Sequence, residues 1–169
     1  MKKLVILTHP NIQESNVNKT WINELKKYPE SFDIHSLYEI YPDLKFDVQK
    51  EQEILSKYDT IIFQFPIHWF GIPFALKKYM DEVLTYGWAF GPGGDKLKGK
   101  KIGFAASTGG PKESYDSFVK LETLLSSVYV SFQFIGSEVI GTHAFYGIST
   151  QPSQESIEEN AKEYVKTFA

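Results

Sequence analysis

Three segments of this sequence gather small, polar and aromatic residues of the kinds that bind a flat ligand carrying a phosphate. The first runs from His9 to Asn18, the second from Pro66 to Phe70 and the third from Ser107 to Tyr115. Helix N-termini and backbone N–H groups bind anions, and aromatic side chains pack against flat rings. The three segments form one site if the fold brings them together.

The second segment is the most informative. An apolar run, Ile61–Phe65, stops at Pro66, which cannot donate to a central strand ladder. Pro73 suits the first turn of a new helix. Between them lies a loop at the edge of an α/β sheet where ligands bind, and it carries Ile67, His68, Trp69 and Phe70. These bulky groups favour a flat apolar ligand, although Trp69 and Phe70 also suit a cap on the core or a dimer contact.

The first segment offers the start of a helix. Ser15 is placed to cap that helix, whose free backbone N–H groups and dipole suit a phosphate. The side chains of Ser15 and Asn18 add donors to the same place. Ser15 equally fits the plain role of an N-cap.

The third segment contains the run Thr108-Gly109-Gly110. Small residues let backbone N–H groups approach a ligand closely, and such donors stabilise negative charge on a reduced ring. A tight turn that requires Gly explains the two glycines equally well.

One other motif is rejected. Residues 94–100 fit the first seven positions of a P-loop, but Lys101 replaces the required Ser or Thr and a strand follows instead of preceding. The neighbouring rings of Tyr86, Trp88 and Phe90 suit a cover over a flat ligand, a dimer contact, or both.

Five strands that alternate with helices are needed to position these segments. The strands are predicted at 3–8, 32–37, 60–65, 101–106 and 138–143. Helices are predicted from Ser15 to Tyr28, at 47–58 and 73–84, from Tyr115 to Val128 with an uncertain end, and from Ile157 to Phe168. This alternation predicts one α/β domain over 1–169, a doubly wound parallel sheet of flavodoxin-like order 2-1-3-4-5. Strands 1, 3 and 4 are then neighbours, so the three segments converge at one edge.

Composition excludes several other classes of protein. The net charge of −3 comes without a basic block, which argues against nucleic-acid binding. There is no Cys, and the four His residues lack a metal-binding spacing, so no metal site is predicted. No apolar run is long enough to insert into a membrane, and a cytoplasmic location is expected. Aromatic residues make up 15% of the chain, which suits a ring-lined site or a subunit interface.

The three segments resemble the flavodoxin-like NAD(P)H:quinone oxidoreductases, a group that includes DT-diaphorase and the ancillary subunits of glutathione-gated potassium efflux systems. The most specific block is Pro66 to Pro73, and the match keeps order and spacing along nearly the whole chain. The resemblance implies a bound flavin and a homodimer that completes the site. The residues it assigns to the ribityl-phosphate end are His9, Ser15, Val17 and Asn18. Those it assigns to the ring are Pro66, Ile67, His68, Trp69, Phe70, Ser107, Thr108, Gly109, Gly110 and Tyr115.

Catalytic roles follow for two residues. Tyr115 falls where the group often has a Tyr near the flavin, but Leu121 stands where DT-diaphorase has a His that helps hydride transfer. His143, at the end of the fifth strand, is expected on the ligand side and is a candidate for substrate contact, with core packing as its alternative. His68 is expected to position the loop of residues 66–70 that lies along the ring, called the ring loop below, and His35 is expected to be structural.

The resemblance implies an FMN-dependent NAD(P)H:quinone oxidoreductase that passes two electrons by hydride transfer in a ping-pong sequence. FMN is expected over FAD because the chain lacks the long C-terminal extension of DT-diaphorase, and NAD(P)H is the expected co-substrate. Alternatives are a flavin-binding regulatory subunit of a potassium efflux transporter, an azo or nitro reductase, and a one-electron carrier. The expected partners are a quinone-like acceptor, a second copy of the chain and, for the regulatory alternative, a transporter.

Overall fold

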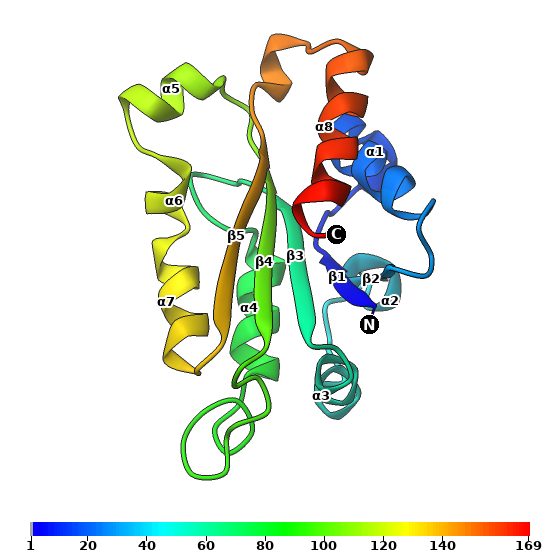
Figure 1. The fold of residues 1–169 in the computed structure, drawn as a ribbon. Helices are drawn as coiled ribbons and strands as arrows, with labels where there is room; N and C mark the ends of the chain where they lie inside the picture. Colours follow the sequence, from blue (N-terminus) through cyan, green and yellow to red (C-terminus); the bar gives the residue numbers. More distant parts are fainter. Residues whose placement is uncertain (1) are drawn as a thin grey trace.

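The fold, described for residues 2–169 by a computed structural model, is a parallel five-stranded sheet between two helical layers (Figure 1). The strands are β1 (Lys3–Leu7), β2 (Phe32–Ser36), β3 (Thr60–Pro66), β4 (Lys101–Ser107) and β5 (Glu138–Phe145). Their order is β2-β1-β3-β4-β5, so the predicted flavodoxin-like order is confirmed. All four neighbouring pairs are parallel.

The helices fill both faces of the sheet. They are α1 (Asn16–Leu25), α2 (Leu37–Ile40), α3 (Val48–Ser56), α4 (Phe74–Val83), α5 (Lys112–Ser117), α6 (Leu121–Leu124), α7 (Ser126–Phe134) and α8 (Gln154–Thr167). Two 3-10 turns, η1 (Ile12–Glu14) and η2 (Ile148–Thr150), complete the set. Helices α1 and α8 pack on one face of the sheet, and α3, α4 and α7 cover the other (Figure 1).

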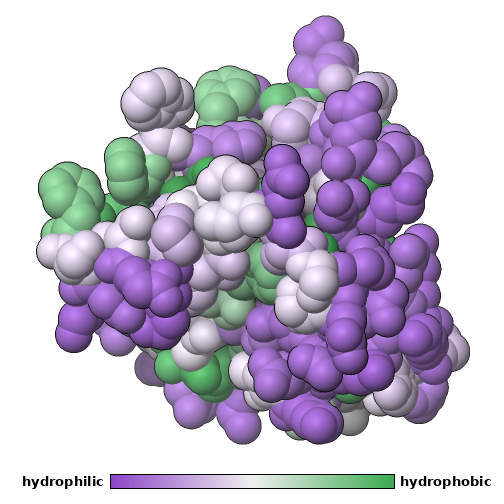
Figure 2. All heavy atoms as spheres, turned by 90° about the horizontal axis from the view of Figure 1, so that it is seen from above, coloured by the Kyte–Doolittle hydropathy of each residue, from purple (hydrophilic) through white to green (hydrophobic). Residues whose placement is uncertain are grey.

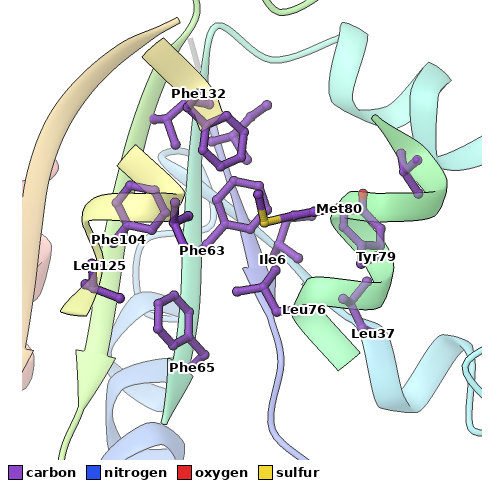
Figure 3. Packing of buried hydrophobic residues seen from close by; sticks show 14 of the residues in the cluster. Ile6, Leu37, Phe63, Phe65, Leu76, Tyr79, Met80, Phe104, Leu125 and Phe132 are labelled. Carbon is purple, nitrogen blue, oxygen red and sulfur yellow. The ribbon is translucent and has the colours of Figure 1, made fainter. Parts of the chain in front are cut away.

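The core follows from the alternation of side chains along buried strands. In β1, Leu4 and Ile6 join the cluster under α4 and α7, whereas Val5 and Leu7 join the cluster under α1 and α8. The first cluster contains a group of packed aromatic rings, in which Phe63 lies 6.0 Å from Phe104 and 5.2 Å from Phe132, centroid to centroid (Figure 3). The bulky rings account for part of the aromatic excess in the composition.

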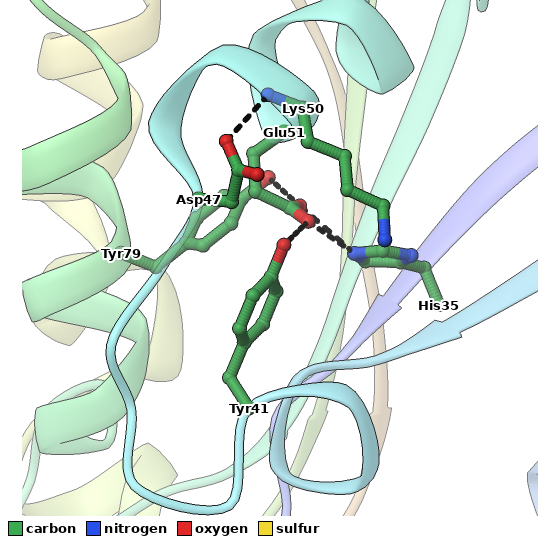
Figure 4. A network of polar contacts seen from close by, with 6 residues as sticks. All are labelled: His35, Tyr41, Asp47, Lys50, Glu51 and Tyr79. Atoms are coloured by element: carbon green, nitrogen blue, oxygen red, sulfur yellow. Dashed lines mark hydrogen bonds and ion pairs between the residues drawn. The ribbon is translucent and has the colours of Figure 1, made fainter.

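A buried carboxylate ties three elements together on the α3 side. Glu51 of α3 is fully buried and lies 2.8 and 3.0 Å from Nε2 of His35 on β2 (Figure 4). The hydroxyls of Tyr41 and Tyr79 donate to it over 2.7 and 3.0 Å. Such a group stays charged in the interior because donors surround it. The structural role predicted for His35 is confirmed.

The segment after β4 departs from the predicted single helix. It forms three short helices, α5, α6 and α7, and residues 128–134, rich in strand-forming types, are helical. Packing overrides propensity here, because the helix buries Phe132 against Phe63 and Phe104. Gly136, with φ of 82°, follows the last turn and donates its N–H to Gln133, as expected of a C-terminal cap.

The Gly-rich segment 87–99 connects the end of α4 to the start of β4, so it lies at the amino edge of the sheet (Figure 1). The three candidate segments follow the carboxyl ends of the strands at the opposite edge. Tyr86, Trp88 and Phe90 therefore do not cover a ligand at that edge of their own chain. A dimer contact, with or without a cover over a ligand of the second copy, stays a prediction.

Candidate functional site

The structure brings the three predicted segments together at the carboxyl edge of β1, β3 and β4. Pro66 and Ser107 are register partners, and the N–H of Ile67 donates to the carbonyl of Ser107 over 2.8 Å. A cavity of about 260 Å³ joins the first segment to the other two, and its lining includes His9, Ser15, Val17, Asn18, Pro66 and Ser107. Figure 2 looks down on this edge and shows apolar side chains gathered at the side of α5.

The amino end of α1 offers two free donors. The N–H groups of Asn16 and Val17 have no acceptor among residues 2–169, whereas the N–H of Asn18 donates to Oγ of Ser15 over 3.1 Å. Ser15 is therefore the N-cap of a ten-residue helix whose dipole also attracts an anion. The Glu14 carboxylate lines the same cavity, so an anion there depends on the two N–H groups and the dipole to outweigh one negative charge.

His9 lines this cavity, and its surroundings favour the neutral imidazole. Partial burial lowers the pKa of His9, and the charge of nearby His68 lowers it further. Its Nδ1 accepts from the N–H of Asn11 over 3.2 Å, so the ring proton resides on Nε2. Nε2 is thus a donor, which suits a ligand oxygen.

The ring loop is a two-residue turn built from unsuitable residues. His68 and Gly71 exchange two backbone hydrogen bonds of 3.0 Å, and Trp69 and Phe70 between them have φ of 47° and 61°. Turns of this kind favour Asn and Gly, because positive φ is unfavourable for large side chains. Burial does not compensate, since Trp69 is 97% exposed and Phe70 52%. Backbone strain combined with exposed rings indicates a binding role for the loop.

The third loop presents two backbone donors side by side. The carbonyls of Thr108 and Gly109 accept from the N–H groups of Ile148 and Ser149 over 3.0 Å each. In a trans peptide the C=O and the next N–H point in opposite directions, so the N–H groups of Gly109 and Gly110 point away from η2. Neither has an acceptor among residues 2–169. Sequence reasoning missed this role of η2, whose one local signal is Gly147 with φ of 86°.

The two glycines of this loop are not explained by a tight turn. Neither Gly109 nor Gly110 has a positive φ, so their backbone conformation is open to other residues. A Cβ on Gly109 would meet no atom within 4 Å, so packing within the chain does not require Gly there either. The prediction that a ligand approaches the backbone here is compatible with this geometry.

Tyr115 lies beside the ring loop in a second cavity. This cavity has a volume of about 320 Å³ and is lined by Phe70, Gly110, Ser114, Tyr115, Phe118 and Val119. Tyr115 packs edge-on against Tyr146, with centroids 5.4 Å apart. Leu121 is buried in the core, so it offers no proton donor in place of the His of DT-diaphorase.

The position of His143 argues against the catalytic role predicted for it. The ring is buried on the α1–α8 side, stacked 5.1 Å from Tyr164 and edge-on to Trp21, and its Nε2 lies 2.9 Å from Oδ1 of Asn160. It pairs with Ala105, two residues before the end of β4. Strand alternation and burial place this side chain in the core, the alternative noted above.

Asn18 also differs from its predicted use. The residue is fully buried and its Nδ2 donates to Oγ of Ser107 over 2.9 Å, not toward the free N–H groups of α1. Its carbonyl oxygens accept from Gln64, a residue that sequence reasoning missed because its strand reads as plain apolar core. The Asn18 side chain therefore adds no donor for a phosphate.

Comparison with known proteins shows the family to which this chain belongs. Residues 1–168 match the protein family described by its flavodoxin-like fold. The chain belongs to this family. It is 41% identical over 170 residues to the uncharacterized NAD(P)H oxidoreductase YdeQ of Bacillus subtilis (strain 168). The alignment covers 98% of this chain and 85% of YdeQ.

Two further relatives of this flavodoxin-like chain are informative. It is 40% identical over 113 residues to the glutathione-regulated potassium-efflux system ancillary protein KefF of Enterobacter sp. (strain 638), covering 67% of this chain and 64% of KefF. The crystal structure of general stress protein 14 from Treponema denticola, in complex with FMN, superimposes with a TM-score of 0.92 at 35% identity and covers 98% of this chain and 97% of that one. The predicted membership among NAD(P)H oxidoreductase-type flavoproteins is confirmed.

The residues at this edge fit FMN. The free N–H pair of Asn16 and Val17 suits one phosphate, and the N–H pair of Gly109 and Gly110 suits the polar edge of a ring. Within residues 2–169 no group of three or more His, Asp or Glu side chains has the arrangement of a metal site. None of the helices in the described part of the chain is both long and apolar enough to cross a membrane.

Proposed function

We propose that this chain is an FMN-dependent NAD(P)H:quinone oxidoreductase that transfers two electrons as hydride in a ping-pong sequence. The observation that carries the proposal is that two sets of free N–H donors lie at the same edge of the sheet, one at the start of α1 and one after β4. The strained aromatic loop after β3 lies at that edge too. FMN in the structure of the Treponema denticola relative and the name of YdeQ support it.

The protein groups divide the work of holding the cofactor. The N–H groups of Asn16 and Val17 hold the phosphate, and those of Gly109 and Gly110 hold the ring oxygen where negative charge develops on reduction. Trp69 and Phe70 flank the face of the ring. Bound FMN supplies the two-electron chemistry, for which the protein provides orientation and electrostatics. A single phosphate cradle favours FMN over FAD.

The cavity beside Tyr115 receives the substrates. Its volume of about 320 Å³ lies in the range of small-molecule pockets, and its lining of Phe70, Tyr115 and Phe118 suits a flat ring. A nicotinamide and a quinone both meet that description, so they occupy the cavity in turn. Tyr115 orients the bound ring, and the Tyr115 hydroxyl lies at the cavity wall.

Spectroscopy and initial rates test this function. Purified protein reconstituted with FMN should show a flavin absorbance band that bleaches anaerobically on addition of NADH or NADPH and returns on addition of a quinone. Rate plots at several quinone concentrations should be parallel. Absence of a flavin band after reconstitution would exclude the function, and intersecting plots would exclude the shared cavity.

A homodimer is part of the proposal. Large apolar side chains stand exposed on the α4–α7 side and continue into the lip of the substrate cavity, namely Phe70, Phe74, Phe118, Val130 and Phe134. Phe70 and Phe118 pair with centroids 6.1 Å apart. Exposed apolar groups in this number indicate an interface, and a second copy seated there completes the wall of the cavity. Light scattering should give twice the 19.4 kDa mass of the chain.

The relationship to KefF favours a second candidate, a flavin-binding regulatory subunit of a potassium efflux transporter. The same fold and cofactor serve both roles, so binding of FMN does not separate them. Trivial turnover together with co-purification of a membrane transporter would select the regulatory role. Fast quinone turnover without such a partner would select the enzyme, and a screen that includes azo and nitro compounds would define its acceptor.

A further inference from the structure

Three buried polar side chains are linked by hydrogen bonds into a row beneath the site, called the hydrogen-bond chain below. Nε2 of Gln64 on β3 donates to the backbone carbonyl and to Oδ1 of Asn18 over 3.2 and 3.3 Å. Nδ2 of Asn18, in the first turn of α1, donates to Oγ of Ser107 on β4 over 2.9 Å. Gln64 and Asn18 are fully buried and Ser107 is 1% exposed. The hydrogen-bond chain therefore joins β3, α1 and β4, and the loops that follow β3 and β4 belong to the site.

The two oxygens of Asn18 that face Gln64 fix which group donates and which accepts in each of these hydrogen bonds. Two carbonyl oxygens of Asn18 face Gln64, so the Gln64 amide must turn its NH₂ toward them. Because Oδ1 of Asn18 faces Gln64, its Nδ2 is the group that faces Ser107. Oγ of Ser107 accepts this bond, and its own proton points elsewhere. No acceptor for that proton occurs among residues 2–169, and Ser107 lines the 260 Å³ cavity.

This orientation leaves Gln64 itself unsatisfied. Its Oε1 is buried without a partner, which is unfavourable in a protein interior. An apolar residue would fill a core position on β3 without that penalty. The arrangement is explained if the purpose of Gln64 is to orient Asn18.

Resting on the proposed function, we propose that Gln64 is a positioning residue. It fixes a polarised hydrogen-bond chain through Asn18 that makes the Ser107 hydroxyl a donor to a ligand oxygen. Successive bonds in one direction strengthen one another. Ser107 stands between the donors of α1, which hold the phosphate, and those of Gly109 and Gly110, which hold the ring. The acceptor is thus a hydroxyl oxygen of the polyol that links phosphate and ring.

A double-mutant cycle tests the chain. In Gln64→Met the donor is lost with little change in volume, so the Asn18 amide is free to turn and accept the Ser107 proton itself. Gln64→Met and Ser107→Ala should each raise the Kd for FMN about 2- to 10-fold, as expected for one neutral hydrogen bond. The double variant should be no weaker than Ser107→Ala alone. Additive losses would overturn the proposal, because they mean that Gln64 acts independently of Ser107.

Controls separate this effect from a change in folding. Tyr164→Phe removes another buried hydroxyl without a partner, remote from the loops, and should leave the Kd unchanged. Riboflavin should lose affinity by the same factor as FMN, since the acceptor is in the polyol; a loss confined to FMN would overturn the assignment. If Gln64→Met does not fold, NMR of the wild-type protein decides: the carboxamide protons of Gln64 and Asn18 should move downfield when FMN binds.

The outcomes distinguish this inference from the function on which it rests. Two results would overturn the hydrogen-bond chain but not the proposed function. In the first, wild-type protein binds FMN and its carboxamide NMR signals do not move. In the second, Gln64→Met binds FMN as tightly as wild-type protein. Wild-type protein that binds no FMN after reconstitution would overturn both.

Discussion

Replacing Trp69 by Asn should stabilise the fold while weakening the site. Trp69 holds φ of 47° in a two-residue turn, a conformation that Asn tolerates and that is unfavourable by roughly 1–2 kcal/mol for most other residues. The side chain is 97% exposed, so its removal sacrifices almost no buried apolar area. We therefore expect Trp69→Asn to raise the free energy of unfolding by about 1 kcal/mol.

The same change should weaken FMN binding, because the ring of Trp69 then no longer packs against the flavin. An aromatic pair contributes about 0.5–1.5 kcal/mol beyond area burial, which corresponds to a rise in Kd of roughly 2- to 10-fold. Urea denaturation of the apo protein and fluorescence titration with FMN measure the two effects separately. A gain in stability opposed to a loss in function is the pattern expected where strain serves a site.

Gln151→Asn is the matched control. Gln151 is exposed and has a similar φ of 55°, but it lines neither cavity of the site. Its replacement should give a comparable gain in stability with no change in Kd. If Trp69→Asn destabilises the protein, the argument from backbone strain is wrong. If it stabilises the protein and leaves FMN affinity intact, the loop does not contact the ring.

Three further changes test other parts of the structure. Gly147→Ala places a Cβ 3.1 Å from Oγ1 of Thr150 at a φ of 86°, so it should destabilise the fold by about 1 kcal/mol and, by shifting the loop that it anchors, weaken FMN binding; denaturation and titration measure both. Burial acts to raise the pKa of Glu51, but hydrogen bonds led by that from His35 lower it overall below 4.5. The stability that Glu51 contributes is then present above about pH 4.5 and is lost as the pH falls through the lower folded-state pKa, so urea denaturation should show a decline in stability at acidic pH. Glu51→Gln should be less stable at pH 7 by about 3–5 kcal/mol and should show a smaller decline at acidic pH. Phe118 is 80% exposed, so Phe118→Ser should weaken the dimer and lower the apparent mass measured by light scattering at micromolar concentration. The urea midpoint of the monomer should not change. An unchanged apparent mass would show that Phe118 is not in the interface.

The fold was predictable because its signals are local and repeated. The sequence located all five strands, the first of them from a continuous apolar run, and the structure extends or shortens each by one or two residues at most. Pro66 closed β3 where its missing N–H required it, and Ser15 capped α1 as its side chain allows. Order followed from alternation, since right-handed crossovers between parallel strands leave few topologies.

The convergence of the site was predictable for the same reason. Loops after neighbouring parallel strands must share an edge, which placed His9, Pro66 and Ser107 around one cavity. The aromatic loop was visible in the sequence because Trp69 and Phe70 lie between two structure-breaking prolines. What the sequence alone determined is therefore the architecture and the edge at which ligand-binding groups collect.

Tertiary structure alone decided which atoms face that edge. Asn18 is 89 residues from Ser107 in the chain and 46 from Gln64, and η2 meets Gly109 from 40 residues away, so no local pattern announces these bonds. His143 went to the core and residues 128–134 became helical because partners from other elements outcompeted local preference. Propensity and periodicity act over a few residues, whereas the direction of a buried donor depends on groups that only the folded chain brings within hydrogen-bonding distance.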